Sequence, residues 1–394
     1  MRLISFLGKG NYDETTYSFK KRTCRTRYVA HALASFFQPQ EIRLIATAEA
    51  WEQHGKELKD ILISIGFTNV EQVWIPTTGE PENLWAIFGK IIELIVPDGE
   101  ILFDITHGFR AHPFFASSCI QYVQSVLPNP PSIRVVYGEY RPGENAISPI
   151  WELTPFLEVL EWSRNLMMFL RTGQADDVVE PTEALGRELG RQWAMSGRQG
   201  TAPQLRALAD ALRAFSDDFT TIRTGSLLIG TRATALRLHD TINQAEQEVA
   251  RHLPALASIL DQVRDMVAPL RTHGARLSSQ AGQQALFALA QLYQRMGRYS
   301  EAISVLREGW ITLGAPPDAD HPGRSFSKEA RENQEQSWKD STKQSRTVSE
   351  MRNDIQHAGF NSQPNDRDWF EQQLTTLLSQ WQEAIDKMDQ PPQG

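Results

Sequence analysis

The chain has 394 residues and a formal net charge of −8, with 40 Lys and Arg residues against 48 Asp and Glu residues. That length allows two or three domains that each bury a core. The negative balance excludes a general basic attraction for nucleic acid, so any RNA contact has to be local. The two cysteines, Cys24 and Cys119, lack metal-ligand spacing and indicate a reduced, cytoplasmic protein. No stretch reaches the roughly 20 apolar residues that span a bilayer, so no membrane partner is expected.

The first 150 residues alternate between short apolar runs and helical patterns, which predicts an α/β domain with a parallel sheet covered on both faces. The expected strands are Leu3–Leu7, Ile42–Thr47, Val70–Ile75, Ile101–Ile105 and Ile133–Tyr137. The expected helices between them are Thr26–Phe37, Glu49–Ile65, Glu82–Val96 and Pro113–Val126. A hairpin with its turn at Arg141–Asn145 follows the last of these strands.

From Trp151 onward, helical periodicity predicts an all-α region, which we divide into residues 151–280 and 281–394. Within it, Ala285–Gly309 is typical of a helical hairpin. Ala315–Ser327 predicts a loop, and Ser327–Gln344 predicts either a solvated helix or a partly mobile segment. Two more helices follow and end near Met388. Breaks between helices are expected at Pro181, Pro203, Pro254, Pro269 and Gly274.

Small, hydroxyl and basic residues follow the expected strands of the first domain. Ligands of open α/β sheets bind beyond the carboxyl ends of the strands, so these residues line a predicted pocket. A helix that begins just after the last of these loops would direct free N–H groups toward an anion. The spacing fits neither a dinucleotide fingerprint nor a P-loop, and a phosphate-bearing ligand is expected. The pocket residues are Gly8, Lys9, Gly10, Asn11, Thr47, Thr106, His107, Gly108 and Arg110.

A second motif lies near the C-terminus, where four residues separate Arg352 from His357. RNA cleavage by the ribose 2′-OH needs a group that transfers a proton and a cation that neutralises the phosphate, and histidine and arginine suit these roles. On a helix, residues five apart differ by about 140°, so two copies across a symmetric dimer would form one composite site. Gly359 is a predicted helix stop that leaves His357 at a helix end, and Asn353 and Asp354 are candidate orienting groups. By its spacing alone, the motif also fits the end of an ordinary surface helix.

Several segments together resemble the CRISPR-associated Rossmann-fold (CARF) proteins with a C-terminal HEPN ribonuclease domain, which are ancillary nucleases of type III CRISPR systems. The most specific segment is Asp104–Arg110, and the others are Ser5–Tyr12, Ile75-Pro76 with Gly79, Leu157–Phe169, Arg298–Gly309 and Arg352–His357. The resemblance implies a Rossmann-like CARF domain over residues 1–150 and a helical HEPN domain after it. It implies a homodimer that binds cyclic tetra- or hexa-adenylate as an allosteric activator. The activated protein would cleave single-stranded RNA in antiviral defence, with no metal, no other cofactor and no DNA partner.

By the same resemblance, Arg352 and His357 are catalytic residues supported by Asn353, and the pocket residues contact the cyclic oligoadenylate. Two other readings stay open. In one, the protein is a ligand-sensing regulator whose catalytically inert helical domain binds a partner. In the other, the sensor pocket also cleaves its cyclic activator slowly, with the Thr106 hydroxyl or the Lys9 ammonium positioning the 2′-OH.

Overall fold

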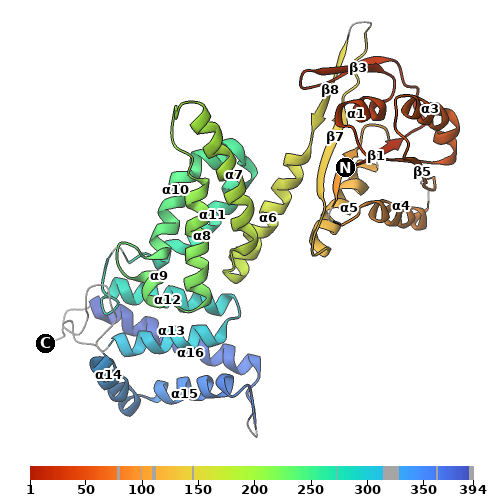
Figure 1. Cartoon of the computed structure of the whole chain (residues 1–394). Helices are drawn as coiled ribbons and strands as arrows, with labels where there is room; N and C mark the ends of the chain where they lie inside the picture. Colours follow the sequence, from red (N-terminus) through yellow and green to blue (C-terminus); the bar gives the residue numbers. More distant parts are fainter. Residues whose placement is uncertain are drawn as a thin grey trace. The chain divides into compact units, whose positions relative to one another are not determined.

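The computed structural model describes residues 1–77, 80–97, 99–108, 112–143, 146–272, 274–313, 328–360 and 363–389. The chain divides into two compact units, Met1–Leu160 and Glu161–Gly394 (Figure 1). The predicted loop at residues 315–327 lies outside the described residues.

The first unit is built on a mixed, mostly parallel sheet, to which the described residues contribute eight strands. The strand order is β3-β2-β8-β7-β6-β1-β4-β5. The five expected strands form within one residue of their predicted bounds and pair in parallel with one another, which confirms the α/β prediction. The strands are β1 Arg2–Leu7, β2 Thr15–Phe19, β3 Arg22–Thr26, β4 Glu41–Ala46, β5 Val70–Trp74, β6 Glu100–Asp104, β7 Ser132–Gly138 and β8 Ile147–Glu152.

Helices cover both faces of this sheet because its central strands are apolar on both sides (Figure 1). Helices α1 (Val29–Phe37) and α3 (Lys56–Ser64) pack with Leu3 and Leu44 on one face. Helices α4 (Pro81–Leu94) and α5 (His112–Val126) pack with side chains such as Ile4, Phe6 and Ile45 on the other. Adjacent residues of one strand therefore anchor opposite helical layers.

The hairpin of β2 and β3 was not predicted. Strand β2 pairs in parallel with β8 and antiparallel with β3, so the hairpin extends the sheet at one edge. Its outer strand, Arg22–Thr26, carries two arginines and is mostly exposed, which removes the apolar signal of a strand. The first helix consequently starts at Val29, and the prediction of a helix from Thr26 was wrong.

The second unit is helical throughout its described residues. The expected helical hairpin is confirmed as α12 and α13, joined by a short turn with Gly297 at φ 71°. Among the described residues, no helix has the length and apolar character that crossing a bilayer requires. The α-helices from α6 onward are α6 Thr154–Thr172, α7 Asp176–Met195, α8 Leu205–Thr220, α9 Thr224–Leu228, α10 Thr234–His252, α11 Ala257–Val267, α12 Gln280–Arg295, α13 Tyr299–Leu313, α14 Lys328–Ser341, α15 Lys343–Gln356 and α16 Arg367–Asp386.

The helix break expected at Pro181 does not occur, because Pro181 lies inside α7. A proline in a helix leaves the carbonyl four residues earlier without its usual N–H donor. Here that carbonyl belongs to Asp177, and the buried side-chain amide of Asn165 on α6 donates to it at 2.8 Å. This contact between two helices supplies the missing hydrogen bond and lets α7 continue.

Helix α16 is anchored by Trp381, whose side chain is fully buried. Its indole Nε1 donates to Gln283 on α12 at 2.9 Å. The ring also lies against Gly309 of α13, where a Cβ atom would come within 1.9 Å of it. The absence of a side chain at Gly309 therefore lets α16 pack closely on the helical hairpin. Helix α15 packs against α13 of the same hairpin.

Candidate functional site

The pocket residues of the first unit lie on the loops that follow β1, β4 and β6. These strands are adjacent in the order β6-β1-β4 and parallel, so their carboxyl ends meet at one edge of the sheet. The β1 and β6 loops come close together, since a Cβ atom on Gly8 would lie 3.8 Å from the Gly108 amide nitrogen. We call this edge the sensor rim; its described predicted members are Gly8, Lys9, Gly10, Asn11, Thr47, Thr106, His107 and Gly108. Arg110 lies outside the described residues.

Tyr12 stabilises the loop after β1, Gly8–Asn11, which we call the glycine loop. Its hydroxyl accepts from the Gly8 amide at 2.8 Å and donates to the Gly8 carbonyl at 2.9 Å. Its ring stacks on His54 with 4.5 Å between centroids and lies 4.1 Å from the His107 ring. His54 in turn donates from Nε2 to the Gly10 carbonyl at 2.7 Å. The loop is thereby held in one conformation by two side chains that sequence reasoning did not include among the site residues.

His54 lies on a π-helical turn, Trp51–Gly55, between the short helix α2 (Ala48–Ala50) and α3. Such turns are rare and are often found at functional sites. The segment was predicted only as part of one helix over Glu49–Ile65. A π-helical turn has no recognisable pattern in the sequence. The position of His54 at the rim is therefore known only from the structure.

His107 offers the sensor rim a neutral hydrogen-bonding group. Burial, together with a smaller contribution from the nearby His54, lowers the pKa of His107 to about 4. The imidazole is therefore uncharged at neutral pH. Its Nε2 atom is shielded from solvent and has no hydrogen-bond partner among the described residues. Buried polar atoms normally have partners, so this atom is a candidate contact for a ligand.

Thr106 is tied into the sheet. Its hydroxyl donates to Asp104 Oδ1 at 2.6 Å and accepts from the Gly138 amide at 2.8 Å. The Lys9 ammonium forms an exposed ion pair with Glu49 at 2.7 Å. Thr47 is buried, and its hydroxyl accepts from the Ala50 amide at 3.3 Å as the N-cap of α2. Thr47 therefore shapes the rim through the helix that it caps. Asn11, in contrast, is exposed.

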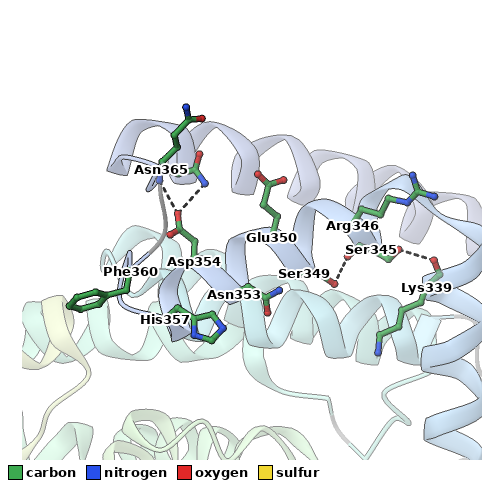
Figure 2. Close-up of a pocket in the computed structure, with 11 residues that line it drawn as sticks. Lys339, Ser345, Arg346, Ser349, Glu350, Asn353, Asp354, His357, Phe360 and Asn365 are labelled. Carbon is green, nitrogen blue, oxygen red and sulfur yellow. Dashed lines mark hydrogen bonds between the residues drawn. The ribbon is translucent and has the colours of Figure 1, made fainter.

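The second motif lies at the end of α15, as Figure 2 shows. His357 is the C-cap residue, and the chain then turns through left-handed conformations at Ala358 (φ 52°) and Gly359 (φ 69°). The Gly359 amide donates to the Asp354 carbonyl at 3.0 Å, and the Ala358 amide donates to Ile355 at 2.9 Å. These two bonds form a Schellman motif and confirm the predicted helix end.

His357 and Asn353 line one cavity of about 640 Å³, which we call the α15 cavity. Both side chains are exposed. They are four residues apart and therefore share one face of the helix. Asp354 is buried beside them, and its Oδ2 accepts from the backbone and side-chain nitrogens of Asn365 at 2.9 and 3.0 Å (Figure 2). This carboxylate joins the end of α15 to the segment before α16. Asp354 and Asn365 also line the cavity, and the other lining residues are Lys339, Ser345, Arg346, Ser349, Glu350, Phe360 and Gln363.

Arg352 lines a different cavity of about 320 Å³, together with Arg307, Glu308 and Arg331. With the amide oxygen of Gln356 turned toward it, the guanidinium donates to that oxygen from Nε at 3.1 Å and Nη2 at 3.2 Å. Within the described residues of one chain, Arg352 and His357 therefore line separate cavities. This arrangement agrees with the angle of about 140° between residues five apart on a helix. Among the described residues, no cluster of three His, Cys, Asp or Glu side chains has the geometry to hold a metal ion.

In a comparison with known protein families, residues 2–142 match the family described as CRISPR system endoribonuclease Csx1, CARF domain. The match begins in β1 and ends before β8, so it includes all three loops of the sensor rim. No curated protein matches the chain.

Proposed function

Because the chain carries the CARF domain of the CRISPR endoribonuclease Csx1 at residues 2–142, we propose that it is an endoribonuclease activated by a cyclic oligoadenylate. The activator, cyclic tetra- or hexa-adenylate, binds at the sensor rim, and single-stranded RNA is cut at the end of α15. The observation that carries this proposal is the exposed His357 in the α15 cavity of a chain whose first domain is a CARF domain.

The chemistry of the rim suits a phosphate-bearing ring. Backbone N–H groups of the glycine loop approach a phosphate without a side chain in the way, and Lys9 adds a positive charge. The neutral His107 offers its Nε2 atom as a further hydrogen-bonding group. Since Tyr12 and His54 already hold the loop in place, little conformational entropy is lost when the ligand binds.

A second copy of the chain is the expected partner of the CARF domain. Trp85 on α4 and Phe114 on α5 are each 73% exposed. Trp85 contacts Phe88 edge-to-face, and Phe88 contacts the half-exposed Tyr122 of α5 in the same way. Exposed apolar patches of this kind mark interaction surfaces, and a two-fold axis matches a cyclic ligand of even ring size.

In the dimer, two α15 ends supply one cleavage site. His357 accepts the proton of the ribose 2′-OH, whose oxygen attacks the adjacent phosphorus. The bond to the 5′-oxygen breaks, and that oxygen takes a proton, which leaves a 2′,3′-cyclic phosphate and a 5′-OH end. Arg352 neutralises the charge that develops on the phosphate, and Asn353 orients the phosphate from the same helix face as His357.

The test is cleavage of a fluorogenic single-stranded RNA by the full-length protein with cyclic tetra-adenylate or cyclic hexa-adenylate. Wild type should cleave with one of the two activators, and His357→Ala and Arg352→Ala should each lose at least about a hundredfold in rate. His252→Ala is the matched control, since His252 is also an exposed histidine at the end of a helix, α10. This control should cleave like wild type.

Two results would overturn the proposal: no cleavage with either activator, or equal cleavage by wild type and His357→Ala. Thermal melting separates the alternatives, because a ligand that binds only the folded state raises the melting temperature. A cyclic oligoadenylate that raises it without inducing cleavage would favour a ligand-sensing regulator whose helical domain binds a partner.

A further inference from the structure

The α15 cavity extends well beyond His357. Arg346, Glu350, Asn353 and His357 follow one another at intervals of four, three and four residues. Eleven residues of helix turn through three full turns to within about 20°, so Arg346 and His357 lie on the same face. At 1.5 Å per residue they are separated by about 16 Å along the axis. Figure 2 shows Arg346 toward one end of α15 and His357 at the other. We call this row of four residues, Arg346, Glu350, Asn353 and His357, the α15 stripe. The stripe is longer than the contact with a single scissile phosphate requires.

The far end of this stripe carries positive charge. Arg346 is exposed and has no ion pair or hydrogen bond among the described residues, although Glu350 lies one turn away. Lys339 of α14 lines the same end of the cavity. Its ammonium pairs with Glu335 at 2.6 Å, but nearly half of its side chain stays exposed. In a chain of net charge −8, two accessible cations in line with the predicted catalytic histidine are a local site for an anion.

We infer that Arg346 and Lys339 bind phosphates of the RNA strand several nucleotides from the bond that is cut. The inference rests on the proposed function and adds the direction of the strand, which runs along α15 from His357 toward α14. Contacts to phosphate strengthen binding without reading sequence, and their contribution falls as salt rises. Glu350 lies between the two ends, so the strand has to pass a carboxylate that repels it.

The experiment compares a decamer with a trinucleotide, because a short substrate reaches the scissile site but not the far cations. The value of kcat/KM is measured on both RNAs with saturating cyclic oligoadenylate. The dissociation constant of a decamer with 2′-O-methyl riboses, which cannot be cleaved, is measured across a salt series. Arg346→Gln and Lys339→Gln should each weaken decamer binding about threefold or more, and should lower the slope of log K against log salt by about 0.7. Both variants should cleave the trinucleotide like wild type.

Two further variants test whether charge along α15 sets the affinity for the decamer, and whether an arginine elsewhere on the surface also affects it. Glu350→Gln should tighten decamer binding, because it removes a like charge from the path of the strand. Arg251→Gln should change nothing, since Arg251 is an exposed arginine that lines a separate cavity next to α7 and α10.

Unchanged binding and salt slopes in both cation variants would overturn the inference, as would an equal loss on the two RNA lengths. A shift in sedimentation without a change in RNA binding would assign the stripe to a contact with a second copy of the chain, and would also overturn it. A wild-type protein that neither binds nor cleaves RNA would instead overturn the proposed function itself. Melting temperatures of all four variants confirm that each one folds.

Discussion

The buried carboxyl group of Asp104 should make the stability of the first unit, Met1–Leu160, depend on pH. Asp104 ends β6, and its side chain is completely buried. It accepts hydrogen bonds from the Ser5 hydroxyl at 2.6 Å, the Thr106 amide at 2.9 Å and the Thr106 hydroxyl at 2.6 Å. Burial raises the pKa of Asp104 to about 6 from an ordinary value of 3.8, and the three hydrogen bonds only partly oppose this.

A carboxyl group whose pKa is higher in the folded state binds its proton more tightly there. The stabilisation by the neutral form is complete below pH 3.8 and is lost as the pH rises through about 6. The difference between these two pKa values corresponds to about 3 kcal/mol. About half of that change, roughly 1.5 kcal/mol, falls between pH 5 and pH 8.

The substitution Asp104→Asn isolates this effect. The amide oxygen still accepts from Thr106, and the amide nitrogen donates to the Ser5 hydroxyl, so the shape and the hydrogen bonds are kept without a charge. Urea unfolding at several pH values, followed by tryptophan fluorescence, should show that the variant gains about 1.5 kcal/mol over wild type between pH 5 and pH 8. Asp60→Asn, at an exposed aspartate of α3, should show no such gain. A difference between Asp104→Asn and wild type that stays constant with pH would refute the reasoning.

Three further predictions concern the helical unit. Gly309→Ala should lower the free energy of unfolding, measured by urea denaturation, by about 1–3 kcal/mol or more, because its Cβ atom would lie 1.9 Å from the buried tryptophan ring of α16. Ala358→Gly should raise the free energy of unfolding by about 0.5–1 kcal/mol, since Ala358 has φ 52°; a lower value in urea unfolding would contradict the left-handed helix end. Burial raises the pKa of Glu335, but hydrogen bonds from Lys339 and Arg307 outweigh it and hold the pKa at about 2. Glu335→Gln should therefore cost about 1–3 kcal/mol at pH 7, and its difference from wild type should shrink as denaturation is measured toward pH 3.

The layout of the first domain was accessible from the sequence because each central strand is a short apolar run. In β1, Leu3 packs on one face of the sheet, and Ile4 and Phe6 pack on the other. Because helices cover both faces, such a strand needs apolar residues on both of its sides. The edge hairpin escaped prediction, since its outer strand is exposed and carries Arg22 and Arg25. The break expected at Pro181 was wrong because the side chain that supplies the missing hydrogen bond comes from another helix.

The amino-acid sequence by itself determined which residues follow the sheet strands, where α15 ends, and that a spacing of five separates Arg352 from His357 on a helix. These properties are local, since they depend on strand ends, on a left-handed turn and on helical periodicity. Only the tertiary structure brought His54 to the Gly10 carbonyl, turned Thr47 into a helix cap and joined Lys339 to the cavity of His357. Such contacts join residues distant along the chain or depend on the orientation of one side chain, and neither leaves a periodic pattern that a single sequence reveals.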